Sequence, residues 1–232
     1  MKERDIEPQG LFQHHLAEEE GEVWRYPAYA VKHFASMDGK LEEKLRLLCR
    51  CRGKNGMEIE RNYWNALVEF HALYALTALM RGYQFKEWDA QSRTSSAAPN
   101  KNCDLALEKD GKPIFAEVKN LSGDLLSERE SKGVVCFEPS PNLGRWLRLK
   151  VNEAAEKGAD LLVCYDDARL GLPHGDFNEV GIKSYLTRHL PANELSWGNG
   201  GRPFWCVPQT SVERVVMLTP SGCFVIQLWA QS

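Results

Sequence analysis

The Asp110-Gly111 pair restricts the fold of this chain more than any other short feature. An Asp-Gly pair between two apolar segments favours a two-residue β-hairpin turn, because both central residues of such a turn need positive φ. With Asp110 and Gly111 as the loop, Lys109 faces Lys112 and each step outward adds one cross-strand pair. This register places Asp104 directly opposite Glu117.

Side-chain alternation then sorts the charged residues of the hairpin onto one face. Successive side chains of a strand point to opposite faces of the sheet, so Asp104 shares its face with Glu117 and Lys119. The apolar residues between them point to the other face, and they include Leu105, Ala116 and Val118. The charged group therefore gathers at one end of the hairpin.

Two opposed carboxylates predict a cation between them. Side chains that face each other across a strand pair lie about 5 Å apart, and like charges so placed are destabilising unless something neutralises them. Mg²⁺ prefers a few carboxylates together with water and phosphate, and Mn²⁺ can substitute for it. Such a site suits phosphodiester hydrolysis, with Lys119 orienting the attacking water or offsetting negative charge. The alternative is an ordinary half-exposed hairpin in which Lys119 pairs with an acid.

The surrounding sequence predicts an α/β fold around this hairpin. Residues 62–81 are apolar almost all round, as in a buried helix that ends at Gly82. A short strand is expected at 83–90, a helix at 143–157 and a buried parallel strand within 159–167. Outside this region, residues 38–50 favour a helix, and the segments around Pro220-Ser221-Gly222 favour a C-terminal hairpin.

These motifs resemble the PD-(D/E)XK nuclease superfamily, which has the restriction-endonuclease-like fold. The resemblance implies an αβββαβ core, a mixed central sheet flanked by helices, with Asp104 as the first acid and Glu117-x-Lys119 as the (D/E)xK motif. Cys103 stands where the family name has proline. The implied organisation is an N-terminal helical extension (1–57), a nuclease-like core (58–167) and a C-terminal addition (168–232) in one compact domain.

The resemblance also implies further site residues. Several branches of the superfamily use a glutamate of the first core helix as an extra metal ligand, and Glu69 matches it. A carboxylate on so apolar a helix needs a partner, although a solvent-facing polar stripe through Asn62, Asn65 and Glu69 remains open. A weaker prediction assigns substrate contacts to four residues, which are Arg93, Arg145, Arg148 and Asn152. Glu87, Asp89, Asp166 and Asp167 are reserve acids near strand ends.

Composition limits the partners and the compartment. The formal net charge of −3 argues against a protein that coats nucleic acid non-specifically, although it leaves room for a local basic groove. No apolar run is long enough to span a bilayer and the first residues do not form a signal peptide, so we expect a cytoplasmic protein without a membrane partner. The seven cysteines contain no CxxC pair, which favours reduced thiols. Cys49-x-Cys51 stays open as a metal-binding pair.

The leading hypothesis is therefore a Mg²⁺-dependent DNA endonuclease, with DNA favoured over RNA. A second hypothesis keeps the fold as a catalytically silent module that binds nucleic acid or protein. A third is a transposase or restriction subunit that is active only with a partner, and both a homodimer and a partner subunit are left open.

Overall fold

The structure is a computed structural model that describes residues 25–34, 39–50, 57–91, 102–120, 143–165, 179–219 and 222–230. The helices of this part are α2 (Arg25–Phe34), α3 (Lys40–Arg50), α4 (Met57–Tyr74), α6 (Leu143–Glu156) and α7 (Glu179–His189), and α4 continues as a π-helical segment, η3 (Ala75–Leu79). The strands are β1 (Gln84–Gln91), β2 (Asn102–Lys109), β3 (Lys112–Asn120), β4 (Leu161–Tyr165), β5 (Leu195–Trp197), β6 (Pro203–Val207), β7 (Arg214–Thr219) and β8 (Gly222–Ala230). None of these helices is long and apolar enough to cross a membrane.

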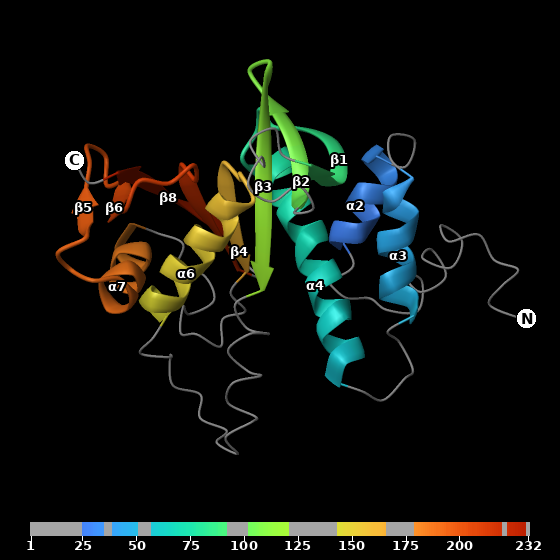
Figure 1. Cartoon of the computed structure of the whole chain (residues 1–232), viewed down its shortest axis with the longest axis horizontal. Helices are drawn as coiled ribbons and strands as arrows, with labels where there is room; N and C mark the ends of the chain where they lie inside the picture. The colour runs from blue at the N-terminus through green and yellow to red at the C-terminus, as the bar shows by residue number, and fades with distance from the viewer. Residues whose placement is uncertain are drawn as a thin grey trace, which may run out of the picture.

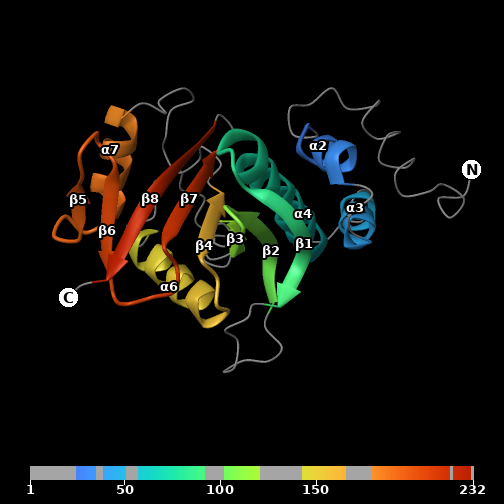
Figure 2. The ribbon, with the colours of Figure 1, turned by 90° about the horizontal axis from the view of Figure 1, so that it is seen from above.

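The strands form one mixed sheet in the order β1-β2-β3-β4-β7-β8-β6-β5, which confirms the predicted α/β class (Figure 2). β1, β2 and β3 are antiparallel neighbours, and β4 lies parallel to both β3 and β7. The chain passes from β3 to β4 through α6, as parallel neighbours require a crossover connection. The predicted order of helix, three strands, helix and strand is therefore present from α4 to β4.

The structure confirms the predicted hairpin register from the turn as far as Leu105 and Ala116. Lys109 pairs with Lys112, and the ladder continues to Leu105 opposite Ala116. Asp110 and Gly111 have φ of 52° and 74°, as a two-residue turn with positive φ at both positions requires. Local turn chemistry has thus fixed the register of the hairpin as far as Leu105 and Ala116.

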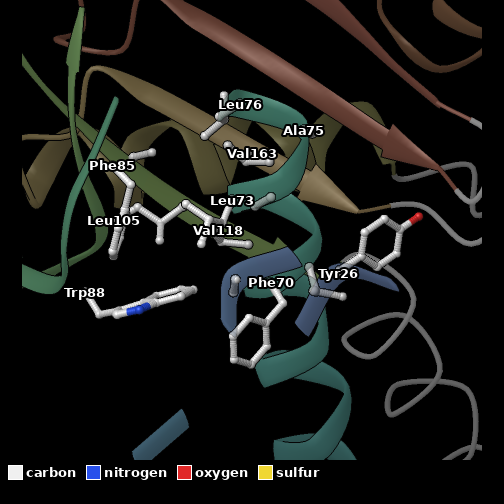
Figure 3. Close-up of a cluster of buried hydrophobic side chains, with 14 of the residues drawn as sticks. Tyr26, Phe70, Leu73, Ala75, Leu76, Phe85, Trp88, Leu105, Val118 and Val163 are labelled. Atoms are coloured by element: carbon white, nitrogen blue, oxygen red, sulfur yellow. The ribbon is translucent and has the colours of Figure 1, made fainter. Parts of the chain in front are cut away.

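The sheet is covered by helices on both faces, each over its own hydrophobic cluster. Figure 1 shows α4 and α6 on opposite sides of β3. Residues of α2, α3 and α4 pack on one face against Leu105, Val118 and Val163, part of which Figure 3 shows. Residues of α6 and α7 pack on the other face against Leu162, Cys164 and Met217. Neighbouring residues of β4 thus belong to different clusters, as expected of a central strand buried on both faces.

The C-terminal hairpin is confirmed, and its place is more central than the sequence indicated. β7 and β8 pair around the predicted turn, with Thr219 opposite Gly222. β7 also pairs with β4, so the hairpin extends the same sheet rather than forming a separate layer. The sequence did not predict α7, β5 or β6. Four cysteines, Cys103, Cys164, Cys206 and Cys223, form no disulfide, and the first two of them are buried.

Candidate functional site

Glu117 is the centre of the candidate site. It lies in the middle of β3, its side chain is 0% exposed, and its Oε1 accepts hydrogen bonds from two lysines. Lys119 comes from the same strand and Lys157 follows α6, with an Nζ–Oε1 distance of 2.5 Å in each case. Oε2 of Glu117 has no hydrogen-bond partner within the described residues. The carboxylate is thus neutralised on one oxygen and left with an unused acceptor on the other.

Asp104 lies where β2 and β3 part. The ladder ends at Leu105 and Ala116, and at the next position Oδ2 of Asp104 accepts a hydrogen bond of 2.7 Å from the backbone N of Val118. The carboxylate thereby accepts a hydrogen bond from a backbone N–H that a neighbouring strand would otherwise accept. This bond ties Asp104 to the residue between Glu117 and Lys119.

Glu69 approaches the site from α4. Its side chain is only 16% exposed, so the solvent-facing alternative is wrong for Glu69, whereas Asn65 of the same predicted stripe is exposed. Lys44 of α3 donates to Glu69 Oε2 at 2.5 Å and lies 3.3 Å from Asp89 Oδ1. The buried carboxylate therefore has its partner, and that partner comes from the N-terminal helical region. Asp89 has φ of 49° within β1.

The charges of the three acids act on one another. Burial raises the pKa of Glu69 to about 7, Lys44 opposes this shift, and Asp104 adds to it. Burial, followed by the charge of Glu117, raises the pKa of Asp104 to about 6. Burial opposes the charges of Lys44 and Lys119, yet their carboxylate partners outweigh it and the pKa of each lysine is raised. The charge of Glu117 thus raises the pKa of Asp104, and the charge of Asp104 in turn raises the pKa of Glu69.

The donor chemistry fits Mg²⁺, although the acids are not arranged as a closed cage. Across the described residues, no three His, Cys, Asp or Glu side chains form a group that could hold a metal ion. Carboxylate oxygens are nevertheless the ligands that Mg²⁺ takes, and it commonly uses only one or two together with water and phosphate. The unpartnered buried Oε2 of Glu117 is such a ligand, and Asp104 supplies a second carboxylate.

Substituting Glu69 tests its place in this coupled group through the pH dependence of stability. The folded-state pKa of about 7 lies above the ordinary value of 4.5, so the folded protein binds more protons in this interval. The contribution of Glu69 to the free energy of unfolding therefore falls as pH rises from about 4.5 to about 7. We expect Glu69→Gln to lose this dependence, measured by thermal unfolding in EDTA at pH 5 and pH 8. An unchanged difference between the two midpoints would contradict the assignment.

The predicted substrate residues do not join the group around Glu117. Arg145 and Asn152 are exposed on α6, and Arg148 pairs with Glu194. Glu194 also accepts a hydrogen bond of 2.9 Å from Trp205, so Arg148 helps to hold α6 against the β5–β6 region. Arg93, Asp166 and Asp167 lie outside the described residues, as do Cys51 and its pairing with Cys49. Contacts of these residues with nucleic acid stay predictions.

Sequence reasoning missed Lys44 and Lys157. Lys44 had a readable signal, since it lies three residues after Leu41 and four before Leu48, and both leucines are buried. A lysine on that stripe lies toward the buried side of the helix, and the Lys44 side chain is only 12% exposed. Lys157 had no such signal, because a lysine at the end of a helix is ordinarily explained by the helix dipole.

No protein-family model, no curated protein and no solved structure matches the chain.

Proposed function

We propose that this chain is a divalent-metal-dependent nuclease of the restriction-endonuclease-like fold that cuts DNA internally. The observation that carries the proposal is Glu117, a fully buried carboxylate with one unpartnered oxygen and Lys119 bonded to the other. A buried polar atom without a partner is costly, and a bound cation would satisfy it. The helix and strand order from α4 to β4 supports the same proposal, since it is the αβββαβ order of that fold.

Each residue of the site has a role that follows from its position. Asp104 and Glu117 would hold Mg²⁺. Glu69 would be an auxiliary ligand after the Lys44 ammonium has moved away from its Oε2. The ion, when bound, would polarise the scissile phosphate and lower the pKa of an attacking water. Lys119 would hold that water or offset the charge that develops on phosphate, because its ammonium lies beside the carboxylate and is partly open to solvent.

Plasmid cleavage tests the proposal directly. Purified protein is expected to nick or linearise supercoiled plasmid with Mg²⁺ or Mn²⁺ and to do neither in EDTA. Lys119→Ala should remove this activity, whereas Lys112→Ala should not, because Lys112 is an exposed residue at the turn end of the same strand. Equal cutting by both variants, or cutting in EDTA, would contradict the proposed site.

A second candidate is a metal-free module that binds nucleic acid or protein. Three lysines pair with the group around Glu117, which gives Glu69, Asp104 and Glu117 a charge balance without any metal. This candidate predicts no Mn²⁺ binding and partner binding that is unchanged by EDTA. A partner-dependent nuclease differs from it by gaining metal-dependent cleavage when a co-expressed neighbour is present.

A further inference from the structure

Lys157 is built into the site by the end of α6. Its backbone N donates to the carbonyls of Glu153 and Ala154, and its own carbonyl accepts the thiol of Cys103 at 3.6 Å. Gly158 follows with φ of 74° and closes the helix. The backbone of Lys157 is thus held against β2, while its side chain is bonded to Glu117 and is 24% exposed.

Among the described side chains that pair at the site, acids and lysines are equal in number, so their charges cancel when all of them are ionised. Its three acids are Glu69, Asp104 and Glu117, and its three lysines are Lys44, Lys119 and Lys157. Asp89 is a fourth acid beside Lys44, but its side chain is 42% exposed, so water screens it. A divalent cation that entered this group would add two positive charges without a counter-charge.

We infer that Lys157 is a positioning residue that acts as an internal counter-cation. It competes with the divalent cation for Glu117, so that the metal binds tightly only together with the phosphodiester backbone. The phosphate supplies the missing negative charge and a new partner for the displaced ammonium, because lysine is a common phosphate-binding group. This inference rests on the proposed nuclease function, and it names the polyanionic substrate as the partner that completes the metal site.

Mn²⁺ binding measures this coupling without any cleavage. Free Mn²⁺ is followed by electron paramagnetic resonance as it is titrated into the full chain, alone and with a short phosphorothioate DNA duplex that resists hydrolysis. Mn²⁺ bound by the duplex alone is subtracted. We expect the affinity for Mn²⁺ to rise at least about tenfold with duplex, because an added unit charge a few ångströms from the ion has an effect of this order even with the screening of bulk water.

Lys157→Gln separates the lysine from the rest of the site. Glutamine keeps a hydrogen-bond donor for Glu117 and removes the charge, so the duplex-free affinity for Mn²⁺ should rise about tenfold and the effect of duplex should shrink. Lys86→Gln is the matched control, because Lys86 pairs with Glu108 on the exposed part of β1 and β2. It should bind Mn²⁺ as the wild type does.

The outcomes separate this inference from the function on which it rests. Equal wild-type affinity with and without duplex, or weaker Mn²⁺ binding in Lys157→Gln, overturns the competition and leaves the nuclease proposal intact. No Mn²⁺ binding under either condition overturns the metal site and the inference together. If Lys157→Gln does not fold, the wild-type titration alone decides.

Discussion

Glu117→Gln is expected to reduce metal-dependent plasmid cleavage more than about a hundredfold, at or beyond the loss for one preorganised electrostatic group. Glutamine has nearly the same shape, so it fills the same buried place on β3. It lacks the negative charge that the proposed ion and both lysines require. The change therefore removes the electrostatic centre of the site without opening a cavity.

The same substitution should also lower the free energy of unfolding, because Lys119 and Lys157 lose their charged partner. Removing one partner of a buried ion pair costs about 3–5 kcal/mol, and the lower end is expected here because Lys119 and Lys157 both reach solvent. Cleavage rates and denaturant unfolding are measured on the same preparation. Glu108→Gln, a partly exposed substitution on the same hairpin, should leave cleavage unchanged. Wild-type cleavage by Glu117→Gln would remove Glu117 from the proposed chemistry.

The hairpin could be predicted because its information is local. Asp110 and Gly111 set the turn, the turn sets the register, and alternation then decides which residues share a face. The outcome at Asp104 was beyond this reasoning. An ideal ladder would continue to Glu117, whereas the short side chain of Asp104 binds the backbone of Val118 instead.

The partners of the acids could not be predicted, because they come from distant parts of the sequence. The prediction of a cation between opposed carboxylates assumed that protein groups would not neutralise them. Lys157 approaches Glu117 from the end of a helix forty positions further along the chain, and Lys44 approaches Glu69 from the N-terminal helices. Hairpin spacing contains no information on either approach. The carboxylates do need positive charge beside them, but lysines of the chain itself supply part of that charge.

The wider sheet shows the same division between local and distant information. The turn residues at 220–222 made the β7–β8 hairpin predictable from the sequence. These residues did not indicate that β7 would lie beside β4. That pairing depends on apolar residues of both strands, such as Val163 and Val216, which share one cluster. Pairing of strands distant in sequence is selected by packing and not by turn chemistry.

Trp88→Ala is expected to cost about 3–5 kcal/mol of stability, the range for truncating a large buried aromatic side chain. Trp88 is fully buried in the α4-side cluster (Figure 3). Its ring lies edge-on to Phe70 at 5.4 Å and to Phe85 at 5.3 Å between centroids, and such pairs stabilise beyond their buried area. Alanine would leave a cavity between β1 and α4, measured as a lower midpoint in chemical denaturation.

The same ring also supports the candidate site. Lys44 Nζ lies 5.6 Å from the Trp88 ring, and Lys40 donates to the Trp88 carbonyl at 2.6 Å, so α3 is positioned partly on this residue. Losing the ring should loosen Lys44 from Glu69. Because Lys44 opposes the upward shift in the pKa of Glu69, the pH dependence of stability that Glu69 imposes should then increase. Trp229→Ala is the matched control, because Trp229 is 37% exposed and packs at a tilt against Phe204, far along the sheet order from β1. If both tryptophan variants lost equal stability, burial at Trp88 would not be what holds α3 and α4 on the sheet.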